Sequence, residues 1–134
     1  MSATYFGTQI NESPTIVLPA GAELTGVQCS ALAIQDGKLV KPAKGANVIG
    51  IALRTMDDTI KAGDDVTVQI KDIGKWKAGG AIAVGDELTT DANGAAVKAE
   101  AGDFVTAIAL TAAEEAGTLV QMQIIKAGHK PAEA

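Results

Sequence analysis

The chain has very few of the residues from which catalytic and metal sites are usually built. It contains one cysteine and one histidine. A single cysteine, Cys29, allows no intrachain disulfide and no cysteine-based metal site. The histidine, His129, lies in the terminal segment GHKPAEA, where a side chain is hard to orient for a Ser-His-Asp triad. The G-x-S-x-G, H-E-x-x-H and G-x-x-x-x-G-K-[ST] patterns are also missing, so we expect no enzyme activity and no cofactor.

Aromatic side chains are scarce as well. They make up 3% of the residues, against 47% for all apolar types. The four aromatic residues are Tyr5, Phe6, Trp76 and Phe104. The core must therefore be built from Val, Ile, Leu and Ala, which bury less surface per residue, and association with other chains would add stability.

Clusters of positive charge and long apolar runs are absent too. The net charge is −5 and there is one arginine, Arg54, which opposes a nucleic-acid partner because a phosphate backbone requires clustered Lys and Arg. No apolar run approaches the roughly 18 residues of a membrane span, and the N-terminus lacks the features of a signal peptide. We therefore expect a soluble protein made in the cytoplasm, with neither a nucleic-acid nor a membrane partner.

Acidic residues occur in adjacent pairs, in segments that we expect to be loops. The pairs are Asp57-Asp58, Asp64-Asp65 and Glu114-Glu115. Such carboxylates could bind a hard cation such as calcium, but neighbouring loop carboxylates are most often simply solvated. No metal site is predicted.

The most informative feature present is an internal repeat. Three pairs of segments match: 31–40 with 87–97, 37–53 with 94–110, and 63–70 with 117–124. In the second pair eight positions are identical, among them Gly37/Gly94 and Gly45/Gly102. The sequence thus contains a quasi-repeat of residues 31–70 and 87–124.

The repeat is composed of strand and turn patterns. Residues 65–71 and 118–124 alternate apolar and polar side chains, as in a strand with one wet face. Asp36-Gly37 and Asn93-Gly94 are tight-hairpin dipeptides. These patterns predict an all-β fold, a small β-barrel or sandwich in which two similar β units pack face to face and close on each other. A helix of at most two turns remains possible at 111–118.

The first 20 residues differ from the repeat. They carry one charge, two prolines and two adjacent aromatic residues, Tyr5 and Phe6. Proline resists helix and favours extended chain, so we interpret residues 1–20 as an N-terminal arm or first edge strand, with a frayed terminus as the alternative. Residues 21–134 form a single β-barrel-like domain in this interpretation.

The segment 71–88 joins the two repeats and holds the only tryptophan. A lone Trp usually anchors a core or its rim, but Trp is also enriched at binding hot spots, so Trp76 is a possible interface anchor. Two β units with glycine-rich hairpins also describe biotinyl and lipoyl carrier domains. Those present a modifiable lysine between methionines, and Lys41, Lys71 and Lys98 lack such neighbours.

The order of these motifs resembles that of a known family. DGKLVKPAKGANVIGIAL is followed by GDDVTVQIKDIGKWK and then by AIAVGDELTTDANGAAVKA. Over about residues 21–125 this order is similar to the capsid decoration proteins of tailed bacteriophages, also called head-stabilising or cement proteins. The hairpin ending in "iGiA" and the "AxxxGDxLxxDxxG" segment carry the resemblance.

The resemblance implies a structural virion protein without enzyme activity, cofactor or metal. Such proteins bind the outer surface of the expanded capsid, commonly as homotrimers at three-fold and quasi-three-fold positions, and stabilise the shell against internal DNA pressure. The partners would be the major capsid protein and further copies of this chain. The expected capsid contacts lie in the arm, at Thr4, Tyr5, Phe6, Ile10 and Pro14. The alternative is a phage tail, fibre or surface β module that binds a protein or carbohydrate.

Overall fold

The computed structural model of the protein describes residues 13–53 and 58–132, and these residues form strands, turns and loops without a helix. The strands are β1 (Thr15–Pro19), β2 (Leu24–Thr25), β3 (Ala31–Gln35), β4 (Lys38–Val40), β5 (Gly50–Ala52), β6 (Thr59–Ile60), β7 (Asp65–Gln69), β8 (Asp72–Lys77), β9 (Glu87–Thr90), β10 (Ala96–Lys98), β11 (Phe104–Ala109) and β12 (Leu119–His129). The prediction of an all-β fold is confirmed. The segment 111–118 is loop, not helix.

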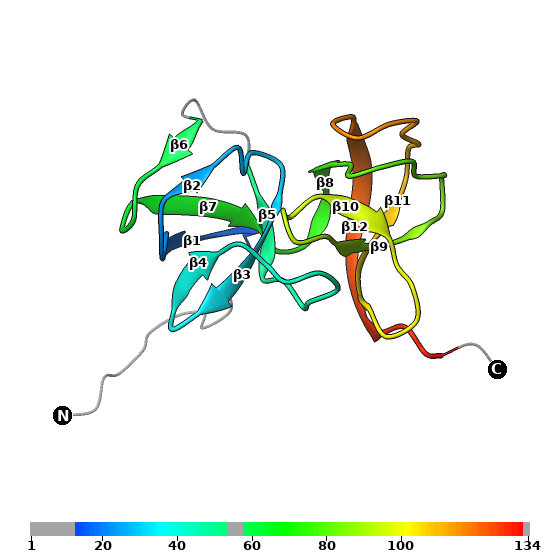
Figure 1. Ribbon diagram of the computed structural model, residues 1–134, viewed down its shortest axis with the longest axis horizontal. Coiled ribbons are helices and arrows are strands. Elements are labelled where there is room, and N and C mark those ends of the chain that lie inside the picture. The colour runs from blue at the N-terminus through cyan, green and yellow to red at the C-terminus, as the bar shows by residue number, and fades with distance from the viewer. Residues whose placement is uncertain (1–12, 54–57, 133–134) are drawn as a thin grey trace.

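Two five-stranded antiparallel sheets with the same strand order make up the body. The N-terminal unit (residues 13–70) has the order β1-β7-β5-β3-β4, and the C-terminal unit (residues 72–132) has the order β8-β12-β11-β9-β10. Every strand of the first sheet therefore has a counterpart at the same place in the second. The duplicated sequence builds one sheet twice, and the two units lie side by side in Figure 1. A short pair, β2 with β6, is added to the N-terminal unit.

The structural repeat begins further upstream than the sequence repeat. β1 pairs with β7 from Thr15 opposite Gln69 to Pro19 opposite Asp65, and β8 pairs with β12 in the same way. β1 is an edge strand, which is one of the two interpretations that the sequence left open for this part of residues 1–20. Residues 1–12 lie outside the described part of the chain.

Each unit curls around its own core. The core of the N-terminal unit contains Ala20, Leu24, Val27, Leu32, Leu39, Ala52, Ile60, Val66 and Val68. The core of the C-terminal unit contains Trp76, Ala78, Ile82, Leu88, Ala96, Ala107, Ala109, Ala113, Val120 and Met122, and Ala31, Val48 and Ile51 join it from the other unit. Within the described residues the two sheets thus form sandwich-like curls that do not close on each other into one barrel.

The edge strands of each sheet meet at one end. The N–H of Gly21 donates to the carbonyl of Leu39 at 2.7 Å, which joins the end of β1 to β4. The N–H of Gly79 donates to the carbonyl of Ala96 at 2.8 Å, which joins β8 to β10 in the same way. The expected face-to-face closure of the units is thus replaced by partial closure within each unit, which already covers part of the exposed edges.

Three turns of the body share the sequence pattern x-x-Gly-Asp. They span 61–64, 83–86 and 100–103, and in each the carboxylate of the aspartate accepts a hydrogen bond from the first backbone N–H, at 3.2, 2.9 and 3.0 Å. The glycines have φ values of 88°, 88° and 90°, which glycine adopts without a Cβ penalty. In each of these turns the N–H of the fourth residue also donates to the carbonyl of the first. A fourth turn, 27–30, has this backbone bond, from Ser30 to Val27, but holds Cys29 in the glycine position.

Candidate functional site

The described chain begins beside the C-terminal end of β7. Of the predicted contact residues, Thr4, Tyr5, Phe6 and Ile10 lie outside the described residues. Pro14 is exposed, and its carbonyl accepts a hydrogen bond from the N–H of Ile70 at 2.8 Å. The described chain therefore enters the body at an edge of the first sheet.

Trp76 belongs to the core. Trp76 is part of β8 and lies opposite Val120 of β12. Its side chain is fully buried, and its indole N–H donates to the carbonyl of Gly94 at 2.8 Å. This corrects the interpretation of Trp76 as an interface anchor, because a buried indole leaves no surface for a partner. The first of the two roles that the sequence allowed, a core anchor with a satisfied N–H, is the one the structure shows.

Backbone hydrogen bonds hold the two units together along a surface that we call the joint. Its bonds run from Ala31 N to Gly94 O (2.7 Å), from Lys77 N to Cys29 O (2.8 Å), from Gly45 N to Thr90 O (2.9 Å) and from Phe104 N to Gly45 O (3.0 Å). A Cβ on Gly94 would overlap the carbonyl of Ala31, and a Cβ on Gly45 would overlap the carboxylate of Asp103. The close approach of the two units thus depends most on Gly94, where the overlap is with backbone, whereas the end of the Asp103 side chain could move away from position 45.

Lys126 adds a side chain to the joint. Its ammonium donates to the carbonyl of Val48 at 2.7 Å and lies 3.4 Å from that of Ile49. Partial burial lowers the pKa of Lys126 because the charged form loses hydration. Lys126 therefore links the last strand of the C-terminal unit to the N-terminal unit.

An apolar groove lies at the joint near the start of β1. It has a volume of about 410 Å³ and is lined by Cys29, Ala52, Leu53, Gln69, Gly74, Lys75 and Leu119. Leu53 and Leu119 are 37% and 41% exposed, and Gln69 lies opposite Thr15 at the start of β1. This groove suits an apolar side chain of a protein partner.

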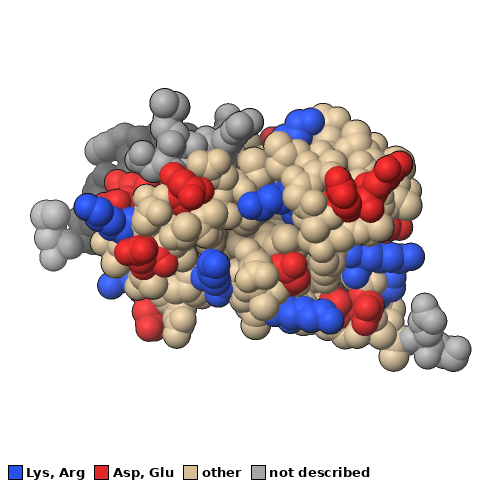
Figure 2. Space-filling model, turned by 45° about the horizontal axis from the view of Figure 1, so that its top comes forward, with Lys and Arg blue, Asp and Glu red and all other residues tan. Residues whose placement is uncertain are grey.

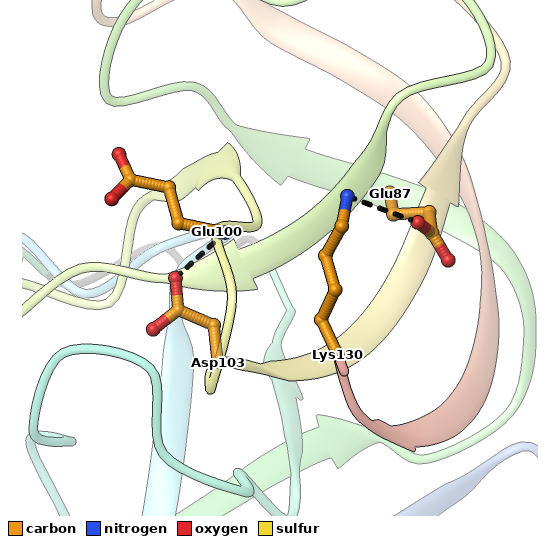
Figure 3. A network of polar contacts seen from close by, with 4 residues as sticks. All are labelled: Glu87, Glu100, Asp103 and Lys130. Carbon is orange, nitrogen blue, oxygen red and sulfur yellow. Dashed lines mark hydrogen bonds and ion pairs between the residues drawn. The ribbon is translucent and has the colours of Figure 1, made fainter. Parts of the chain in front are cut away.

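A polar cluster lies at the far end of β12. Lys130 and Glu87 point toward each other and form an ion pair at 3.3 Å, while the carboxylate of Asp103 bonds the N–H of Glu100 (Figure 3). His129 is part of β12, with its ring edge-on to Phe104 and Nδ1 3.1 Å from the carbonyl of Gly102. The imidazole thus contacts a carbonyl and a phenyl ring, although its position in the sequence suggested a side chain that is hard to orient.

Charge on the surface is mixed. In the face shown in Figure 2, lysines alternate with acidic residues and some lysines lie in the hollow between the two units. Within residues 13–53 and 58–132 no group of three or more His, Cys, Asp or Glu side chains could hold a metal ion. The same part of the chain has no helix long and apolar enough to cross a membrane.

Comparison with known families decides where the chain belongs. The phage cement protein family matches residues 19–124, which include both units from the end of β1 to the middle of β12. The chain belongs to the phage cement protein family. This confirms the resemblance found in the sequence and makes this cement protein a structural phage protein.

The fold of the cement protein also occurs in a solved structure. The head fiber gp8.5 N base in bacteriophage phi29 matches with a TM-score of 0.64 and 23% sequence identity, over 85% of this chain and 95% of that chain. At this identity the match establishes a shared fold. No curated protein matches the cement protein's sequence.

Proposed function

We propose that this cement protein binds the outer surface of the expanded capsid of its phage and stabilises the shell against internal DNA pressure. The observation that carries the proposal is the family match, which extends over both units. The partner in this proposal is the major capsid protein. The protein contributes binding alone, with no reaction and no cofactor.

The arm provides the main capsid contact in this proposal. Its predicted contact residues are Thr4, Tyr5, Phe6, Ile10 and Pro14, and the exposed position of Pro14 at the edge of the first sheet supports an arm that projects from the body. An extended segment can add a strand to a sheet edge of a partner, where backbone hydrogen bonds give affinity and alternate side chains give specificity. The tyrosine and phenylalanine would be its anchors.

A trimer at three-fold and quasi-three-fold positions is the proposed assembly. Large apolar side chains remain exposed in the described part of the protomer: Val17, Ile34, Leu53, Ile73, Val84, Leu110, Leu119 and Ile125. Burial of some of them between protomers would supplement an alanine-rich core. Three arms on one trimer would also engage neighbouring capsid subunits together, and linked contacts of this kind gain roughly 10²–10⁴ in avidity.

The test mixes the purified protein with expanded, undecorated capsids. We expect saturable co-sedimentation and a higher melting temperature of the decorated capsid. Capsids that have not expanded serve as the control, because their surface subunits are arranged differently, and should bind less. Failure to bind expanded capsids at micromolar protein would refute the proposal.

The solved structure with the same fold supports a second candidate. That protein is described as the N base of a head fiber, so the present chain could also act as the base of a fibre on a phage head. The two candidates differ in the mass of the polypeptide in purified virions. A mass near 13.5 kDa supports decoration, whereas a larger polypeptide that contains this sequence supports a fibre base.

A further inference from the structure

The joint between the two units is heterologous, since different surfaces of the repeated unit meet in it. The loop of Gly45 in the N-terminal unit donates to Thr90 and accepts from Phe104, both of the C-terminal unit. The counterpart of Gly45 in the C-terminal unit is Gly102, with φ of 90° against 73°. A heterologous contact leaves one unmatched surface at each end of the pair, so the loop of Gly102 could receive another unit in the same way.

A short segment of the same chain covers this second surface. We call residues 128–132 the strap. The N–H of Gly102 donates to the carbonyl of Lys130 at 2.8 Å, and the carbonyl of Gly102 lies 3.1 Å from Nδ1 of His129. The strap therefore contacts both backbone groups of Gly102, as Thr90 and Phe104 contact both groups of Gly45.

The side chain of Lys130 extends the correspondence. Lys130 pairs with Glu87 at 3.3 Å (Figure 3). Glu87 lies opposite Ile108 in its sheet, as Ala31 lies opposite Ile51 in the other, so Glu87 is the counterpart of Ala31. The N–H of Ala31 bonds Gly94 across the joint. The strap thus occupies, on the C-terminal unit, the place that the β9–β10 hairpin occupies on the N-terminal unit.

The strap begins where the two units diverge. Asp72 follows β7 and Lys126 lies at the equivalent position in β12, and both have a positive φ, 69° and 43°. After Asp72 the chain continues as β8 into the next unit. After Lys126 the chain instead stays paired with β11, past a shift in register, with Gly128 opposite Val105 and His129 opposite Phe104.

The matching surface on the N-terminal unit is open. Ile34 on the β3–β4 hairpin is 50% exposed, while its counterpart Thr90 is fully buried in the joint. Gly37 at the tip of that hairpin is exposed, while its counterpart Gly94 is buried. An exposed isoleucine at a position that the joint buries in the other unit is consistent with an unmatched docking face.

We propose that the strap blocks a docking surface for a second copy of this chain, and that release of the strap lets the β3–β4 hairpin of one copy bind the Gly102 loop of the next. The β3–β4 turn is the shorter of the two hairpin turns, with four residues between Ile34 and Leu39 against five between Thr90 and Ala96. The contact also lacks the covalent link that favours the joint within a chain. We therefore expect dissociation constants of micromolar or weaker. Because the contact is heterologous, it should build chains of growing length.

The test releases the strap in the full-length protein. The double variant His129→Ala/Lys130→Pro removes the imidazole, the ammonium and the N–H that bonds the carbonyl of Asp103 at 2.7 Å, and the side chain of His129 is exposed. Sedimentation velocity over roughly a hundredfold concentration range should show a constant mass for the wild type, whatever its subunit number. The variant should grow in mass with concentration and reach no plateau.

The matched control adds Ile34→Asp to the strap variant and should restore the wild-type mass at every concentration. In a milder variant, Glu87→Lys, the new lysine repels Lys130, and the mass should increase less steeply with concentration. This variant provides a second test if the double variant unfolds. Fluorescence of the buried Trp76 reports folding. A folded strap variant, or a folded Glu87→Lys protein, that keeps the wild-type mass throughout overturns the proposal. No capsid is used, so the result is independent of capsid binding.

Discussion

Cys29 and Gly85 hold the same place in the two units, and both have a positive φ, 55° and 88°. The N–H of Cys29 bonds the carbonyl of Ala52 at 3.0 Å, and that of Gly85 bonds the carbonyl of Ala109, the counterpart of Ala52, at 2.8 Å. The turn of the C-terminal unit thus has a glycine, which adopts a positive φ easily. The turn of the N-terminal unit has a cysteine in the left-handed region, which residues with a Cβ adopt at a cost in free energy.

We expect Cys29→Gly to leave the free energy of unfolding within about 1 kcal/mol of the wild type. Glycine relieves the backbone strain, and this gain offsets the lost burial of the thiol and the higher conformational entropy of the unfolded chain. Cys29→Val should cost more than about 2 kcal/mol, since a β-branched residue fits a positive φ poorly. Urea denaturation measures both. A glycine variant less stable than the valine variant would contradict the assigned correspondence.

Gly94 and Gly37 provide a matched pair for the joint. Both have a positive φ, 84° and 76°, but a Cβ on Gly94 would overlap the carbonyl of Ala31, whereas a Cβ on Gly37 would meet open space. Both alanine variants incur the cost of a positive φ, and only Gly94→Ala also forces the units apart. We expect Gly94→Ala to be less stable than Gly37→Ala by about 1–3 kcal/mol. Equal losses in thermal or urea denaturation would show that the joint adds little to stability.

Asp86 tests the x-x-Gly-Asp turns. Its carboxylate accepts the N–H of Ala83 at 2.9 Å. Asp86→Ala leaves that donor without its acceptor and should lower the free energy of unfolding by about 0.5–1.5 kcal/mol. Asp86→Asn keeps an acceptor oxygen and should retain most of that stability. If the two variants unfold at the same urea concentration, the hydrogen bond contributes nothing measurable.

The parts of this fold that the sequence predicted depend on local patterns. Alternation along 65–71 and 118–124 and the hairpin dipeptides Asp36-Gly37 and Asn93-Gly94 identify strands and turns, because both signals act between neighbours in the chain. The match of β1 to β8 was not visible, since TIVLP and DIGKWK share no pattern of identity. The two strands are equivalent because β1 pairs with β7 as β8 pairs with β12. This pairing cannot be predicted from the sequence of either strand alone.

The separation into two cores was missed for a related reason. Alternation shows which side chains are buried, but it does not show which unit they pack against. Ala31 and Ile51 belong to the repeat of the N-terminal unit and yet pack in the core of the C-terminal unit. The bonds from Gly102 to Lys130 and His129 connect residues far apart in sequence, one of them entirely through backbone atoms. No residue type marks such a contact in advance.

Lys126 predicts a pH dependence of stability. Burial lowers the pKa of Lys126 from the ordinary 10.5, so the unfolded chain keeps this proton at pH values where the folded chain has released it. Stability then rises with pH between the folded pKa and 10.5, and the cost of burying the charged form is fully present at lower pH. Lys126→Met lacks this contribution. As the pH rises toward 10.5, urea denaturation should show the wild type gaining stability relative to the variant. A difference in stability that does not change with pH would contradict this prediction.

The last prediction separates the arm from the body. Deletion of residues 2–12 leaves Pro14, whose carbonyl bonds Ile70, and the whole of β1 in place. The free energy of unfolding should therefore stay within about 0.5 kcal/mol of the wild type. Binding to expanded capsids should weaken at least tenfold, because the proposed strand addition and its avidity are lost. The variant Tyr5→Ala/Phe6→Ala keeps the length of the arm and removes its aromatic anchors, so it should show an intermediate loss. Co-sedimentation that saturates at the same protein concentration with and without residues 2–12 would assign capsid binding to the body, with the apolar groove between Leu53 and Leu119 as the next surface to mutate.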